Sequence, residues 1–521
     1  MKKIKNIVML SLLAVVFATS SCSDFLNVNT DPNRVTGDNI TPDLIFTNAQ
    51  TSVGARQATR FIFLNNWMGY MSRSGTFIVE QEETTYKVAN TFPETNWDQA
   101  YNTLFDLYQV QTRALAAKDS VLAGASMVLS VKLWQETVDQ FGAIPYAQAF
   151  DYVNYPRPAY TPAADIYADL LVKMDQAISY LNAAAPKSSF VKTDLIFCRG
   201  GAINVANKGM EIPDAIVLWK KFANTIKLRM FLRQSEKGFT PSSAQIAKIT
   251  ADGGFLAAGE DVAVQPGYSN QTAKQNPFYG QFGLTPSGAP ATTNNKPNNY
   301  FKALLSTTDP RLERFYASSN GLPTGITGTD YGAVGGNKAS VGGLPVFTGT
   351  EIGPGLAGSA TQDQFILPSF ESLFFQAEAA QRGWITGTAQ TLFESAITQS
   401  FVWLGVATAT ASATTYITTV PSAMWANSGT TSAAKIQFIA FQKYIALCGV
   451  DAVESWSDLR RGVLVLPAAS GYTYLSNNVN KDSRGLPRVM PYPQTELTTN
   501  SASLPARTAD NIFTEKLFWQ P

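Results

Sequence analysis

Apolar residues recur at intervals of three and four along much of this chain, the spacing that places them on one face of an α-helix. One such stripe consists of Trp97, Tyr101, Leu104 and Tyr108, and Asn96 before it suits an N-cap. Further stripes predict helices over residues 127–141, 166–181, 219–230, 370–384, 393–401 and 436–447. Helix-breaking residues mark three of the expected ends: Gly142 and Pro145 follow residues 127–141, Pro186 follows 166–181, and Gly449 follows 436–447.

The predicted helices imply a mainly α architecture. The segments 370–384 and 393–401 are expected to form an antiparallel hairpin, and alanines at 377, 379 and 380 would allow close packing similar to that of tetratricopeptide repeats. The chain shows no clean 34-residue repeat. Residues 253–361 have a different texture, rich in Gly, Pro, Asn, Thr and Ser, and such a long irregular stretch is usually functional or mobile. We therefore predict a helical scaffold with a loop-rich insert.

The N-terminus has the pattern of a lipoprotein signal. Three lysines precede an apolar run of about a dozen residues, which is too short to span a membrane but suits a signal peptide. Small residues then lead into Cys22, although Thr19 stands where such signals usually carry leucine. We predict a signal peptide over residues 1–21, lipidation of Cys22, a polar tether over 22–40 and a single domain over 41–521. The alternative is an ordinary secretory signal with an incidental cysteine.

Composition narrows the classes of partner. Charged residues make up only 15% of the chain, against roughly 25% in an average soluble protein, while aromatic residues reach 12%. Removal of residues 1–21 would delete three lysines and no acidic residues, leaving 37 basic and 39 acidic side chains. Such a balance argues against nucleic acid, which is held mainly by phosphate neutralisation. A neutral, polar ligand such as a sugar suits this surface, although an uncharged surface with no such role fits composition equally well.

Few catalytic groups are available. The chain contains no histidine, which excludes Ser-His-Asp and Cys-His catalysis and histidine metal sites. Carboxylate pairs remain: the acidic residues of EQEETTY (80–86) are expected in a solvated loop, and those of VESWSDLRRG (453–462) in structural ion pairs with the adjacent arginines. We predict neither an enzyme nor a cofactor or metal site; Asn478, Asn480 and Asp482 alternate like calcium ligands but lack the glycine and the closing glutamate.

The two remaining cysteines leave one question open. Cys198 and Cys448 could pair in an oxidising compartment, but Cys448 lies in an apolar helical pattern. A buried free cysteine behaves as a small hydrophobe, which is the interpretation we favour.

Aromatic residues among amides and carboxylates are the best binding signal, because a sugar has flat C–H faces edged by hydroxyls. Two loop regions, 70–97 and 268–300, show this mixture. The candidate ligand-binding residues are Tyr70, Phe77, Tyr86, Phe92, Asn276, Phe278, Tyr279 and Gln281. The tryptophans of the helical stripes, Trp134, Trp219 and Trp384, are expected in the core.

Several segments, in order along the whole chain, resemble the SusD-like outer-membrane lipoproteins of Bacteroidetes, in particular the branch associated with starch binding. They are CSDFLNVNTDPNR, ETNWDQAYNTLFDL, MVLSVKLWQETVDQFGAIPYAQAF, LWKKFANTIKLRMFLR, DPRLERFY, ESLFFQAEAAQRGW, ESWSDLRRG, RVMPYPQTE and NIFTEKLFWQP. The resemblance implies four tetratricopeptide-like helix pairs that scaffold a loop-rich face. It also implies a surface-exposed lipoprotein of the outer membrane, anchored through Cys22, that covers a SusC-like TonB-dependent transporter.

By the same resemblance, the protein would pass an oligosaccharide into the transporter without chemistry. A peptide is the alternative ligand, and a carboxylate-dependent glycoside hydrolase or an adhesion protein is a more remote alternative. Ligand contacts vary within the family, so none of the candidate residues is carried over from it.

Overall fold

The computed structural model describes residues 40–73, 81–183, 187–201, 209–305, 308–318, 323–333 and 352–521. The predicted signal peptide, Cys22, most of the tether and Phe77 lie outside these ranges. Within them, no helix combines the length and the apolar character needed to cross a membrane.

Long helices dominate the described chain, as the hydrophobic spacing predicts. They are α3 (Pro42–Thr59), α6 (Glu94–Ala116), α7 (Ser120–Phe141), α8 (Ala163–Ala183), α10 (Ile212–Gln234), α16 (Ser369–Gln381), α17 (Ala389–Trp403), α18 (Ala409–Thr419), α19 (Ser432–Ala446), α11 (Ser243–Ala251) and α20 (Ala452–Arg461). Each predicted stripe lies wholly or for the most part in one of them, so the mainly α fold class is confirmed.

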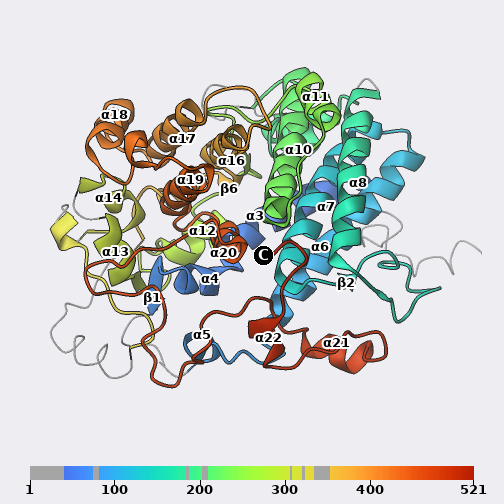
Figure 1. Cartoon of the computed structure of the whole chain (residues 1–521). Helices are drawn as coiled ribbons and strands as arrows, with labels where there is room; N and C mark the ends of the chain where they lie inside the picture. Colours follow the sequence, from blue (N-terminus) through green and yellow to red (C-terminus); the bar gives the residue numbers. More distant parts are fainter. Residues whose placement is uncertain are drawn as a thin grey trace, which may run out of the picture.

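The long helices pack in sequence-adjacent pairs. On one side of the molecule α6, α7, α8 and α10 stand next to one another, and on the other side α16, α17, α18 and α19 form a second group (Figure 1). The predicted hairpin is present as α16 and α17, which pack along each other, and α10 joins the groups by contacting both α8 and α16.

Short helices and strands make up the rest of the regular structure that is described. The short helices are α4 (Ile62–Trp67), α5 (Glu82–Thr85), α9 (Phe190–Thr193), α12 (Pro277–Phe282), α13 (Asn299–Leu305), α14 (Leu312–Phe315), α21 (Gln494–Thr499) and α22 (Asn511–Thr514). The strands form antiparallel pairs: β1 (Met71–Arg73) with β5 (Asn295–Pro297), β2 (Ile144–Pro145) with β3 (Tyr160–Thr161), and β4 (Val262–Val264) with β6 (Gln364–Leu367). The described part of the insert 253–361 therefore holds several short helices and strands.

Helix α7 shows how the sequence sets an element. Asp119 accepts a hydrogen bond from the Leu122 backbone N–H, 3.1 Å away, which caps the first turn. The helix stops at Gly142, whose φ of 77° is costly for other residues, as predicted. Every residue of α7 except Ser120 is buried, so this helix lies inside the molecule.

Two predicted details are wrong. Helix α6 begins at Glu94, so Asn96 is not its N-cap; the Asn96 side-chain amide instead donates to the Arg60 carbonyl at 3.3 Å. Helix α16 ends at Gln381, so Trp384 lies beyond its end and is only half-buried. Trp134 and Trp219 are buried as expected.

A buried chain of alternating charges ties five helices together. It runs through Asp139, Arg233, Glu454, Lys443, Asp458, Arg461 and Glu378, on α7, α10, α20, α19 and α16, with N–O distances of 2.6 to 3.1 Å. Because each buried charge has an opposite neighbour, loss of one partner would leave an uncompensated charge.

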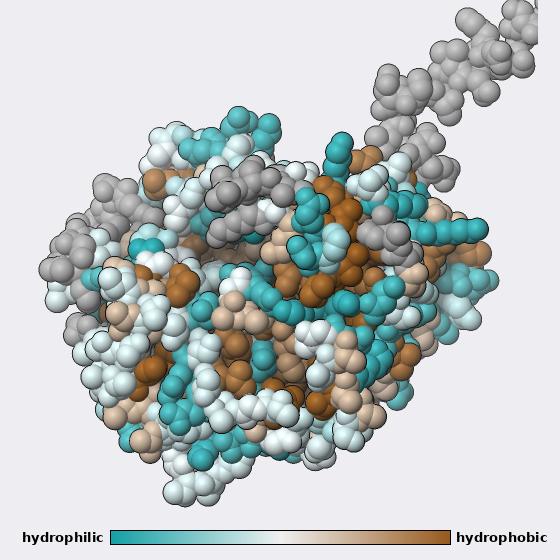
Figure 2. All heavy atoms as spheres, turned by 90° about the horizontal axis from the view of Figure 1, so that it is seen from above, coloured by the Kyte–Doolittle hydropathy of each residue, from teal (hydrophilic) through white to brown (hydrophobic). Residues whose placement is uncertain are grey.

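Hydrophobic and hydrophilic residues are interspersed on the upper face of the molecule. Seen from above, hydrophobic residues lie in patches between hydrophilic and intermediate ones (Figure 2).

Candidate functional site

Four of the candidate binding residues are buried in the core. The Tyr70 ring stacks on Tyr444 with centroids 4.7 Å apart, and Phe278 packs against Phe365. Tyr86 is fully buried, and Asn276 caps α12 by accepting from the Tyr279 N–H at 2.8 Å. A side chain without exposed surface cannot stack on or hydrogen-bond to a ligand in this conformation. The helical spacing of apolar residues could not identify these four as core residues, because they lie outside the long helices and loop residues also fill the core here.

The structure does bring the two predicted loop regions together. Strand β1 comes from 70–97 and β5 from 268–300, and they pair with Ser72 opposite Lys296. Arg73 bridges the seam: it donates to the Asn295 side-chain oxygen at 2.9 Å and forms an ion pair with Glu83. Glu83 is therefore a buried structural group, and residues Glu82–Thr85 of the segment expected to be a solvated loop form the short helix α5.

Phe92, Tyr279 and Gln281 keep part of their surface exposed. Phe92 meets Phe63 edge to face, with ring centroids 5.1 Å apart. These three residues remain predictions.

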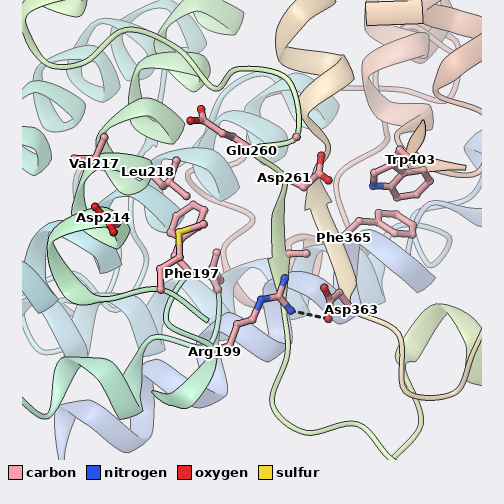
Figure 3. Close-up of a pocket in the computed structure, with 14 residues that line it drawn as sticks. Phe197, Arg199, Asp214, Val217, Leu218, Glu260, Asp261, Asp363, Phe365 and Trp403 are labelled. Carbon is pink, nitrogen blue, oxygen red and sulfur yellow. Dashed lines mark ion pairs between the residues drawn. The ribbon is translucent and has the colours of Figure 1, made fainter. Parts of the chain in front are cut away.

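A cleft with a volume of about 510 Å³ lies elsewhere, between α10 and the β4–β6 pair. Val217 and Leu218 of α10 lie on one side, and Phe365 of β6 and Trp403 at the end of α17 lie on the other (Figure 3). Trp403 is half-buried and packs in T-shaped geometry against Phe365 and Phe370, whose ring centroids are 5.5 and 5.6 Å away. The cleft thus has a fixed aromatic side and an aliphatic side.

Charged groups form the polar lining of this cleft. Arg199 pairs with Asp363 at 2.7 Å (Figure 3), and Glu260 pairs with Lys221, also at 2.7 Å. Asp261 accepts from the Ser369 backbone N–H at 2.7 Å, at the start of α16. Each of these three carboxylates is held in place before any ligand arrives, which lowers the ordering cost of binding.

An aromatic ring beside oriented carboxylates and a guanidinium can stack on a sugar face and hydrogen-bond to its hydroxyls. Sequence reasoning missed this site because β4, β6, α10 and α17 supply single residues far apart in the chain. No local signal marked Trp403, because it follows Ala396 at i+7 and so lies at the edge of the apolar stripe of residues 393–401.

Glu454 and Asp458, which were also weighed for catalysis, serve the scaffold. Burial alone would raise the pKa of Glu454, but Arg233 and Lys443 outweigh it and hold that pKa well below its ordinary value. Burial raises the pKa of Asp458, which is offset only in part by Lys443. Both belong to the buried charge chain. The predicted pairing with an adjacent arginine is confirmed for Asp458, which binds Arg461, whereas Glu454 pairs with Arg233 and Lys443 from other helices.

Other sequence motifs are also structural. Cys198 and Cys448 are free and buried, as favoured. Hydrogen bonds from Arg484 lower the pKa of Asp482 to about 2, so this carboxylate serves an ion pair. Within the described ranges, no cluster of three or more acidic or cysteine side chains could hold a metal ion.

Several solved structures have an architecture similar to this one. An outer-membrane protein of Bacteroides vulgatus described as involved in nutrient binding is 21% identical, with a TM-score of 0.70 over 92% of this chain and 100% of that one. A SusD-like protein of Bacteroides thetaiotaomicron is 18% identical, with a TM-score of 0.68 over 92% and 99%. A chitin-binding SusD homologue of Flavobacterium johnsoniae is 21% identical, with a TM-score of 0.63 over 88% and 92%. The fold is therefore the helical SusD-like fold.

The sequence itself matches a family model over residues 32–493, and that family is described as starch-binding, associating with the outer membrane. This protein belongs to that SusD-like family. A comparison with curated proteins finds no match.

Proposed function

We propose that this protein is a cell-surface lipoprotein that captures an oligosaccharide and delivers it to a SusC-like TonB-dependent transporter of the outer membrane, without chemistry. The family match over residues 32–493 carries the proposal. The lipoprotein signal ending at Cys22 and the near-neutral composition support the location and the ligand class.

The ligand would bind in the cleft beside Trp403. The sugar face would stack on the indole, and its hydroxyls would meet Asp261, Asp363 and Arg199. Replacing Trp403 by alanine should weaken binding by about 1–3 kcal/mol, or roughly 5- to 150-fold, by analogy with base–aromatic stacking.

Isothermal titration calorimetry of the folded chain with maltoheptaose and chitohexaose tests this site. Trp425→Ala is the matched control, because Trp425 is also half-buried but does not line the cleft. Equal affinities in both variants and the wild type would refute the cleft as the ligand site.

A peptide remains the second candidate ligand, because the cleft lining carries the four carboxylates Asp214, Glu260, Asp261 and Asp363 against Arg199. Titration with a lysine-rich peptide distinguishes the two. A signal that falls steeply with added salt would favour the peptide, since exposed charge interactions are screened.

The transporter is tested by purification from gently solubilised outer membranes. An affinity tag can follow Pro521, which is exposed although Trp519 and Gln520 before it are buried. A large barrel protein in stoichiometric amount is the expected result. Recovery of the lipidated protein alone would contradict delivery to a transporter.

A further inference from the structure

A second groove, with a volume of about 440 Å³, lies between α6, the segment after β2 and α21. Trp97 and Tyr101 of α6 and Phe150 form its aromatic lining. It shares no lining residue with the cleft of Figure 3.

The aromatic surface continues beyond this groove along α6. Phe105 and Tyr108 follow Tyr101 at i+4 and i+7, so the three rings lie on one face of the helix. Phe105 and Tyr108 keep 38% and 42% of their surface exposed. The face from residue 101 to 108 is about 10 Å long at the helical rise, which is longer than one sugar ring.

Phe150 joins the groove to this exposed stripe. Its ring lies 5.6 Å from Phe105 and 5.5 Å from Tyr108, measured between centroids. Its φ of 72° is a left-handed conformation that is costly for a bulky residue. Strained residues of this kind concentrate at functional sites, because the surrounding structure must hold them there.

The rim of the groove is polar. Asp98 and Asn102 stand one turn apart on α6 and are exposed, and Thr495 and Glu496 of α21 face them across the groove. The Thr495 hydroxyl oxygen is buried without a hydrogen-bond partner among the described residues. Glu496 is held by the Tyr160 hydroxyl, which donates to its carboxylate at 2.7 Å.

From this arrangement we infer that the groove and the α6 stripe form a second binding platform for a neutral glycan chain, separate from the cleft beside Trp403. Rings would contact the C–H faces of successive sugars, while the rim would hydrogen-bond to hydroxyls. Asp98 and Glu496 disfavour an anionic polymer. The inference rests on the proposed function, since it assigns the same ligand class to another surface.

Affinity electrophoresis through gels containing amylopectin or glycol chitin tests the platform. One variant combines Phe105→Ala with Tyr108→Ala and so removes the two partly exposed rings of α6. A second variant, Phe150→Gly, removes the ring that packs against both of them and also relieves the backbone strain at residue 150. Leu115→Ala is the matched control, because Leu115 lies further along the same face of α6 and is 39% exposed. Retardation should fall roughly fivefold or more in both ring variants and remain unchanged in the control.

Trp403→Ala separates this platform from the cleft. We expect the Trp403→Ala protein to retain part of the retardation, and the ring substitutions to remove that remainder. If Trp403→Ala abolishes retardation and the ring variants behave as wild type, the platform is refuted and the proposed function stands.

Two further outcomes are also decisive. If the wild type is retarded by neither polymer, the proposed glycan binding and the platform both fail. If the ring variants bind glycan normally but no longer co-purify with a barrel protein, the stripe is a protein-docking surface and the glycan platform is wrong.

Discussion

Replacing Glu371 by methionine should stabilise this protein, although the residue is fully buried in the first turn of α16. Both oxygens of its carboxylate lack a hydrogen-bond partner within the described structure. The nearest cation, the Nη1 atom of Arg229, is 4.0 Å away, beyond hydrogen-bond reach, while Arg229 donates to Gln135 at 3.0 and 2.9 Å. Glu371 is therefore poorly compensated for its burial.

The expected gain follows from the unsatisfied oxygens. A buried polar group without a partner costs about 1–3 kcal/mol, and methionine has nearly the same length and volume as glutamate. We expect the Glu371→Met variant to gain about 1–3 kcal/mol in the free energy of unfolding at pH 7.

The gain should depend on pH. Burial, with Asp451 adding repulsion, raises the pKa of Glu371 well above its ordinary value of 4.5. The folded state then binds this proton more tightly than the unfolded chain, so the wild type loses stability as pH rises above about 4.5 towards the raised pKa. The advantage of methionine should accordingly be small near pH 4 and larger at pH 7.

Glu378, two turns further along α16, is the matched control. It is equally buried but pairs with Arg461 at 2.6 Å and Arg382 at 2.8 Å, and although burial opposes them these partners lower its pKa to about 2. Glu378→Met should lower the free energy of unfolding by about 3–5 kcal/mol, because the buried Arg461 guanidinium would lose a carboxylate partner. Its wild-type contribution is present above pH 4.5 and is lost as pH falls towards 2.

Urea unfolding between pH 4 and 8, followed by far-ultraviolet circular dichroism, measures both variants. If Glu371→Met instead loses several kcal/mol, with the loss growing as pH rises, Glu371 is ionised and its pair with Arg229 is a working ion pair. That result would refute the reasoning.

Three further predictions concern other parts of the chain. Phe278→Ala should cost about 3–5 kcal/mol of stability by leaving a cavity, whereas half-exposed Tyr279→Ala should cost less, as urea unfolding would show; equal losses would contradict the burial difference. Gly449→Ala should lose about 1–3 kcal/mol in the same assay, since its φ is 71° and an added Cβ would lie 2.6 Å from Leu356; unchanged stability would show that the turn adapts. Cys22→Ala should release the protein from washed membranes, because the lipid anchor would be lost; retention in the membrane fraction would contradict lipidation of Cys22.

The helical scaffold could be predicted from sequence because the 3.6-residue spacing of apolar residues identifies a helix from that segment alone. The stripes in α6, α7, α8 and α10 each need only their own residues to be recognised. Asn96 shows the limit, since the start of α6 depends on the chain before it, where Pro93 precedes the first helical residue.

The candidate site could be predicted less well, because a cleft is made by residues that are neighbours only after folding. Trp403, Asp261 and Arg199 come from three distant segments, and no local pattern links them. Tyr70 and Phe278 illustrate the opposite error: in loops without periodicity, a ring that fills the core cannot be told from a ring that faces a ligand.

The burial of α7 along nearly its whole length has a consequence for how the protein unfolds. A helix enclosed on all sides exchanges its amide hydrogens with solvent only when its neighbours have separated, so α7 should report global unfolding. Short outer elements such as α21, none of whose residues is buried, should exchange through local fraying long before that. Deuterium uptake would therefore divide the protein into a slow central axis and a fast periphery, and the α21 side of the second groove belongs to the fast part.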